Sequence, residues 1–237
     1  MTTFQFTFDK IRETFTQILQ NGYQVIRCLD YVKMKQALPE KTLVNRIDID
    51  ISIKKSARLA VIFNELGIKG TFFIRLHAPE YNPFSFENYR ILKFIRDSGH
   101  EIGYHSEVVD ESAIWEEPAA QCLVRDLEII NRMLGIKVKG IASHGGMTGL
   151  NNLDFWKHHQ PREFGLAYEA YDEQPEFDLF KNSFYVSDSN WTYWKCYRHG
   201  TLVEGDHRSL GQHAESGHPV IYSLIHADTF FDRHFYE

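Results

Sequence analysis

The feature that most constrains the fold is a repeated alternation between short apolar runs and longer stretches of helical period. Strand-like runs lie at 23–29, 44–53, 70–76, 100–105, 138–143, 165–170, 183–187 and 219–225. Amphipathic helical stretches lie at 9–20, 54–66, 86–97 and 119–134. Because parallel strands need long connections, this alternation predicts an α/β fold with a mostly parallel sheet. About seven such repeats favour a distorted (β/α) barrel over a flat doubly wound sheet.

The composition indicates one globular domain. The chain has 237 residues, of which 43% are hydrophobic, and this is enough for one sizeable core. No linker, low-complexity tract or change of composition divides it. We therefore expect a single domain over 1–237, with 1–42 forming a helix and strand extension packed on the barrel.

Charge, cysteine content and hydropathy exclude several classes of protein. A formal net charge of -6 offers no basic field to a nucleic-acid backbone. Cys28, Cys122 and Cys196 are an odd number without CxxC spacing, so neither a disulfide framework nor a cysteine-based zinc site is indicated. No apolar run is long enough to span a membrane, and residues 1–10 lack the features of a signal peptide. The sequence therefore predicts a cytoplasmic protein without a nucleic-acid partner.

Two acidic residues share one face of the strand predicted at 44–53, which reads V-N-R-I-D-I-D-I-S-I. Side chains alternate along a strand, so Asp48 and Asp50 emerge on the same side, with Cα atoms roughly 6–7 Å apart. Two ionised carboxylates in a site of low dielectric repel each other unless a cation or a shared proton intervenes. Taken alone, the pattern equally fits a solvated edge strand. Arg46 lies on the same face, and we interpret it as a charge partner of these acids rather than as a substrate clamp.

Histidines end three other predicted strands. His105, His144 and His226 close the runs I-G-Y-H, I-A-S-H and S-L-I-H. In a parallel barrel, catalytic groups gather at the carboxyl ends of the strands. A single histidine at such a place is more often a packing residue, but three together with a D-x-D strand indicate a site.

One aspartate and two histidines are a common ligand set for a catalytic divalent metal. Nitrogen and carboxylate ligands without thiolate favour zinc, and they also suit cobalt, nickel or manganese. Such a metal lowers the pKa of water toward ~7 and polarises a carbonyl oxygen. A second acid can then act as general base and a further histidine as general acid, so these residues fit hydrolysis of an amide.

Several motifs resemble those of the polysaccharide deacetylases with NodB homology, in the branch with an R-x-D-x-D first motif. They are R-I-D-I-D at 46–50, G-H-E-I-G-Y-H at 99–105, A-S-H-G-G at 142–146 and L-I-H at 224–226. The resemblance covers about residues 43–227 in the family's order. It implies a NodB-type barrel and metal-dependent removal of an acetyl group from a sugar.

The resemblance also implies roles for individual residues. Asp48 matches the family's catalytic base, Asp50 its metal-binding aspartate and His105 its first histidine ligand. His226 matches the histidine that acts as general acid, and Asp188 is a candidate to orient it, although a turn or N-cap aspartate is an equally good interpretation of Asp188.

The sequence departs from the family at the second histidine ligand, where it has Val109. We propose His144 as the third ligand, with Glu107 and Asp110 as alternatives. Arg75 ends the strand T-F-F-I-R, and we expect it to face the mouth of the barrel.

These residues predict an N-deacetylase that acts on an acetamido sugar in surface-polysaccharide biosynthesis, of the O-antigen or capsule type. A nucleotide-linked or lipid-linked sugar fits an expected cytoplasmic location. Two alternatives remain: a hydrolase of the same fold that acts on a non-sugar C–N bond, as allantoinases do, and a catalytically inactive barrel used for binding.

Overall fold

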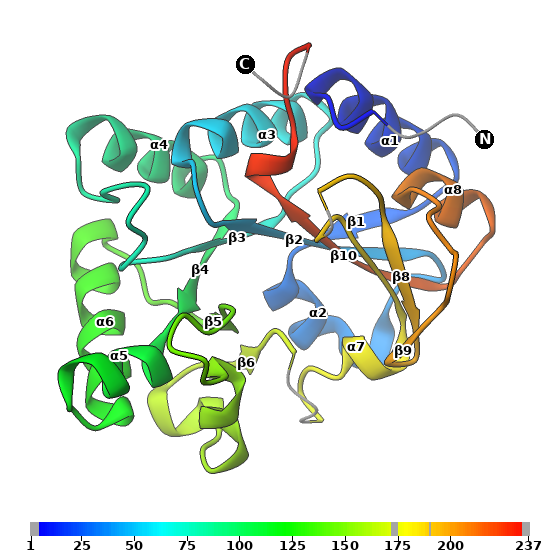
Figure 1. Ribbon diagram of the computed structural model, residues 1–237. Coiled ribbons are helices and arrows are strands. Elements are labelled where there is room, and N and C mark those ends of the chain that lie inside the picture. Colours follow the sequence, from blue (N-terminus) through cyan, green and yellow to red (C-terminus); the bar gives the residue numbers. More distant parts are fainter. Residues whose placement is uncertain (1–4, 172–174, 190, 234–237) are drawn as a thin grey trace.

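The computed structural model describes residues 5–171, 175–189 and 191–233 (Figure 1). The α-helices are α1 Phe8–Gln20, α2 Cys28–Met34, α3 Ile53–Glu65, α4 Phe86–Asp97, α5 Val108–Trp115, α6 Ala119–Leu134, α7 Leu179–Asn182 and α8 Leu210–Glu215. The strands are β1 Gln24–Ile26, β2 Thr42–Ile49, β3 Thr71–Ile74, β4 Glu101–Ser106, β5 Gly140–Ser143, β6 Tyr168–Glu169, β7 Phe184–Ser187, β8 Lys195–Arg198, β9 Thr201–Leu202 and β10 Val220–His226. Short 3₁₀ helices lie at Lys35–Ala37, Asn152–Lys157, Pro161–Phe164 and Ala227–Thr229.

The strands form one 10-stranded sheet in the order β6-β5-β4-β3-β2-β10-β7-β8-β9, with β1 paired to β2. Every pairing from β6 through to β7 is parallel, and so is that of β1. In the described residues, β8 runs antiparallel to β7, and β9 runs antiparallel to β8. The prediction of an α/β fold with a mostly parallel sheet is therefore confirmed.

The predicted distorted barrel of about seven parallel strands is confirmed only as a mostly parallel α/β sheet, because in the described part of the chain the sheet has ten strands and does not close between β6 and β7. Strand β6 contributes only Tyr168–Glu169 to the ladder. It begins late because the residues just before it form the 3₁₀ turn Pro161–Phe164. Side chains cross the gap. The hydroxyl groups of Tyr171 and Tyr185 lie 3.2 Å apart, and the Tyr222 hydroxyl donates to the Ala170 carbonyl oxygen at 3.0 Å.

The alternation along β2 separates two apolar clusters. Ile47 packs with Phe63 of α3 in the cluster on the helical side of the sheet. Val44 belongs to the second cluster, with Phe73 of β3 and Tyr222 of β10. Figure 1 shows α3, α4 and α6 around the outside of the strands, so the second cluster fills the concave side of the sheet.

The N-terminal segment joins this architecture directly. Strand β1 extends the sheet beside the first residues of β2, and α1 packs against α8 and α3. Helix α3 begins at an N-cap serine, since the Ser52 side chain accepts a hydrogen bond from the Lys55 amide. The chain therefore leaves β2 at Ile49 and enters α3 at Ile53, with Asp50 in the short turn between them. Among the helices of the described ranges, none combines the length and apolar character needed to cross a bilayer.

Close packing inside the curved sheet predicts a large effect at Gly103 of β4. A Cβ atom there would meet the ring of Phe73 and would lie 3.0 Å from the Gly140 carbonyl oxygen. We expect Gly103→Ala to lower the free energy of unfolding by about 1–3 kcal/mol, as overpacked cores do. Urea unfolding measures this.

Gly145→Ala is the matched control, because nothing lies within 4 Å of its added Cβ. It should change the free energy of unfolding by less than about 0.5 kcal/mol. Equal effects of the two substitutions would contradict this description of the interior.

Candidate active site

The polar residues that follow the predicted strands converge at the carboxyl ends of β2, β4, β5 and β10. Asp48 lies in β2 and Asp50 directly after it, and His105 lies in β4. His144 follows β5, and His226 ends β10. The parallel register aligns these ends, for example by pairing His226 with Asp48. The sheet thus brings together side chains that lie far apart in the sequence.

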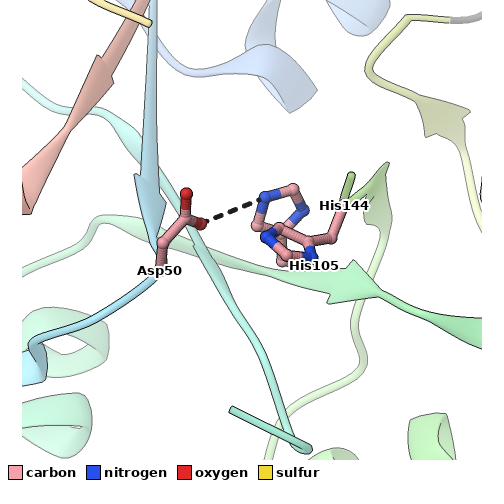
Figure 2. A group of neighbouring side chains, drawn as sticks. All are labelled: Asp50, His105 and His144. Atoms are coloured by element: carbon pink, nitrogen blue, oxygen red, sulfur yellow. Dashed lines mark ion pairs between the residues drawn. The ribbon is translucent and has the colours of Figure 1, made fainter. Parts of the chain in front are cut away.

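Asp50, His105 and His144 form one group, in which the candidate ligand atoms all lie within 4.8 Å of one another. Figure 2 shows the Asp50 carboxylate facing the two imidazole rings. His105 Nε2 lies 3.4 Å from Asp50 Oδ1, and the ring centroids of His105 and His144 are 5.0 Å apart. These are the three residues that the sequence predicts as metal ligands.

The electrostatic state of this group fits a divalent cation. Asp50 Oδ1 is buried and has no hydrogen-bond partner among the described residues. Burial opposes ionisation of Asp50, but the contact with His105 and the charges of His226 and His144 prevail and lower its pKa. His105 places its Nδ1 2.9 Å from the Ala142 carbonyl oxygen, so Nδ1 donates there and Nε2 faces the carboxylates of Asp48 and Asp50. Burial lowers the pKa of His105, but these two carboxylates outweigh it and raise the pKa; a cation at this place would displace the Nε2 proton. Two imidazoles and a carboxylate are a set that zinc accepts.

Arg46 and Asp48 form an ion pair inside the curved sheet. Arg46 is 0% exposed, and its Nε and Nη2 donate to Asp48 Oδ1 and Oδ2 at 2.9 and 2.7 Å. The guanidinium also lies over the ring of Tyr171, at 4.2 Å. Burial raises the pKa of Asp48, but the charges of Arg46 and His105 outweigh it, so the pKa lies below its usual range. Arg46 therefore holds Asp48 ionised, as a charge partner does.

Glu107 and Arg75 lie next to this group and contact Asp50 and His144. Arg75 donates to Glu107 Oε1 at 2.7 Å through Nη2 and to the Asp50 carbonyl oxygen at 3.0 Å through Nη1. Glu107 Oε1 lies 3.1 Å from His144 Nδ1, although the two are not aligned for a hydrogen bond. Arg75 thus links the backbone of Asp50, at the end of β2, to Glu107 beside His144.

Asp110 does not join the group. Its carboxylate accepts hydrogen bonds from the Met147 and Thr148 amides and from the Asn152 side chain. These contacts fix the loop that follows His144. Val109, which stands where the family has its second histidine, packs against the apolar core on the helical side of the sheet.

His226 and Asp188 form a second hydrogen-bonded unit. His226 Nδ1 lies 2.6 Å from Asp188 Oδ1, and the His226 amide donates to Asp188 Oδ2 at 2.9 Å. His226 Nε2 lies 3.7 Å from Asp50 Oδ2, on the side of the Asp50, His105 and His144 group. Burial lowers the pKa of His226, but Asp188, Asp50 and Asp48 outweigh it and raise the pKa to about 9. Asp188 therefore orients a histidine that is protonated at neutral pH.

Two further residues, Asp228 and Trp191, lie at the site. Asp228 is buried, and its Oδ2 accepts a hydrogen bond from the Ile51 amide at 2.9 Å. Burial raises the pKa of Asp228 to about 6, aided by the charge of Asp50; its place just after the strand-ending His226 was the available signal. Trp191, 36% exposed and with a φ of 63°, stacks over the His226 ring at 5.9 Å.

Comparisons with known proteins add only weak similarities. The sequence matches no protein-family model and no curated protein sequence. The chain is similar to the structure of IcaB from Ammonifex degensii, with a TM-score of 0.49 and 16% identity over 68% of this chain and 74% of that one. It is also similar to a mutant of BA3943, a CE4 family pseudoenzyme with restored enzymatic activity, with a TM-score of 0.45, 15% identity and coverage of 80% of this chain and 59% of that one. We draw no functional conclusion from similarities this low.

The His226–Asp188 contact predicts a pH dependence in the metal-free protein. The folded-state pKa of about 9 exceeds the ordinary 6.5, so the charged ring stabilises the fold fully below pH ~6.5 and loses this contribution as the pH rises through about 9. In Asp188→Asn the pKa should fall toward its ordinary value. Proton NMR titration of the ring in chelator-treated protein measures it, and urea unfolding across the same pH range measures the linked stability.

Asp97→Asn is the control, because Asp97 is an exposed surface residue paired with Arg96. It should leave the His226 titration where it is. A wild-type His226 that titrates with its ordinary pKa would contradict the proposed coupling to Asp188.

Proposed function

We propose that this protein is a metal-dependent amide hydrolase that removes the acetyl group from an acetamido sugar. The observation that supports it most is the convergence of Asp50, His105 and His144 into one group flanked by Asp48 and His226. The motif resemblance to polysaccharide deacetylases directs the choice of substrate. Surface-polysaccharide synthesis, with a nucleotide-linked or lipid-linked sugar in the cytoplasm, belongs to the same hypothesis.

Asp50, His105 and His144 would hold the divalent ion, and zinc suits their nitrogen and oxygen donors. When bound, such an ion supplies Lewis acidity toward the amide carbonyl and lowers the pKa of water. The chain itself contributes the positions of these ligands. The Ala142 carbonyl fixes the His105 tautomer, and Arg75 holds the backbone of Asp50.

Asp48 and His226 divide the proton transfers. Asp48, kept ionised by Arg46, accepts a proton from the attacking water as the oxygen of that water bonds to the acetyl carbonyl carbon. Asp48 Oδ2 accepts from Arg46 and also faces His105 Nε2 at 3.2 Å, whereas Oδ1 accepts from Arg46 Nε and has a second lone pair for the water proton. His226, kept protonated beside Asp188, gives its Nε2 proton to the amine as the C–N bond breaks. The products are acetate and the free amino sugar.

Acetate release tests the proposed function. Purified protein loaded with zinc should release acetate from nucleotide-linked or lipid-linked N-acetylhexosamines, and chelator should abolish the release. His226→Gln should lower kcat by about 10²–10⁴, because it removes the general acid. His159→Gln is the control, because His159 is partly exposed and pairs with Glu163; this variant should retain wild-type activity. Absence of acetate release from every N-acetylated sugar tried would contradict the proposal.

Metal content tests the assignment of the third ligand. His144→Ala should weaken binding of the ion at this site, since only two of the three proposed ligands then remain. Asp110→Asn should bind it as the wild type does, because Asp110 is engaged by the loop after His144. Isothermal titration of the apoprotein with zinc measures both. The reverse pattern would make Asp110 the ligand and exclude His144.

A further inference from the structure

A second group of metal-ligating side chains lies away from the candidate active site, at the antiparallel edge of the sheet. Cys196, Asp206 and His213 place candidate ligand atoms within 4.8 Å of one another. Cys196 belongs to β8, Asp206 to the turn between β9 and α8, and His213 to α8. Strands β10 and β7 separate β8 from β2, which carries Asp48.

His213 is the unusual member of this group. Its side chain is 0% exposed, and neither Nδ1 nor Nε2 has a hydrogen-bond partner in the described ranges. Nε2 faces Asp206 Oδ1 at 3.7 Å, beyond hydrogen-bond distance. Buried polar groups without partners are costly and uncommon, so an imidazole with two free nitrogens beside a carboxylate and a thiol indicates a missing partner.

The chemistry of the three side chains identifies the class of that partner. Thiolate, imidazole and carboxylate together are ligands of zinc and of metals that replace it, such as cobalt. Ligand atoms on one tetrahedral zinc ion lie roughly 3.4 Å apart for bonds of about 2.0–2.1 Å. The separation of 3.7 Å between His213 Nε2 and Asp206 Oδ1 needs only a small adjustment to reach this value.

Arg208 forms an ion pair with the Asp206 carboxylate when no cation is bound. Its Nε and Nη2 donate to Asp206 Oδ1 and Oδ2 at 2.9 and 2.6 Å. The Arg208 side chain is 45% exposed, so it can turn into solvent when a cation takes its place. The guanidinium thus neutralises the carboxylate in the metal-free protein.

We propose that Cys196, Asp206 and His213 bind one zinc-class divalent ion that ties β8 to the start of the last αβ unit. Binding releases the Cys196 thiol proton to solvent and leaves a thiolate on the metal. The segment needs such a tie, because β9 has only two residues, both exposed, and the turn after it is largely polar. The proposal is independent of the hydrolase, whose proposed ligands include no cysteine.

Cobalt titration of the chelator-treated apoprotein tests the proposal. Thiolate bound to cobalt gives a charge-transfer band in the near ultraviolet, and ligands restricted to nitrogen and oxygen do not. We expect this band in the wild type and its loss in Cys196→Ser and His213→Gln. Cys122→Ser, which changes another buried cysteine, is the control and should keep the band. Zinc content should fall by about one equivalent per chain in Cys196→Ser.

The wild-type titration decides the question even if a variant fails to fold. A wild type without the band at saturating cobalt overturns the proposal and makes the group a packing cluster with a neutral, buried His213. A band that survives in folded Cys196→Ser overturns it as well. A band that vanishes in both ligand variants, together with unchanged cobalt binding at the Asp50 group, supports it.

Discussion

The structure depends on how charge is balanced along β2. Asp48 and Asp50 emerge near each other at the end of one buried strand, where two carboxylates need cations close by. Arg46 supplies the first from the interior of the sheet, with both Asp48 oxygens accepting from its guanidinium. Breaking such a buried pair by removing one partner costs about 3–5 kcal/mol in other proteins. Asp48 is thereby neutralised from one side, and Asp50 is left facing the histidines.

The order of the strands places histidines on both sides of the two acids of β2. Strand β2 has β3 and then β4 on one side and β10 and then β7 on the other. His105 therefore approaches the acids from β4, whereas His226 approaches from β10 with Asp188 behind it. An ionised Asp48 and a protonated His226, which are register partners of β2 and β10, therefore lie close together beside Asp50. The proposed transfer of two protons needs such a pair at one pH.

Sequence patterns predicted the parts of this architecture that depend on local period. The alternation of helical and strand-like segments gave a mostly parallel sheet, and the strand ends placed the candidate ligands, including His144. Closure of the barrel depends on pairing over 165–170, where turn geometry with Gly165 at a φ of 73° leaves only Tyr168–Glu169 in the ladder. Asp228 was not predicted, because its environment is formed by the distant Ile51 segment. Cys196 was not predicted either, because the spacing of the three cysteines does not reveal that Cys196 lies beside Asp206 and His213.

The proposed hydrolase requires Asp50, His105 and His144 to share one divalent ion. Anomalous diffraction at the zinc absorption edge, from crystals of the zinc-loaded protein, locates that ion. We expect a peak within about 2.0–2.2 Å of an Asp50 oxygen and of one ring nitrogen each of His105 and His144. A zinc peak elsewhere at this end of the sheet would contradict this arrangement. The absence of a peak between these three side chains in fully zinc-loaded protein would contradict it as well.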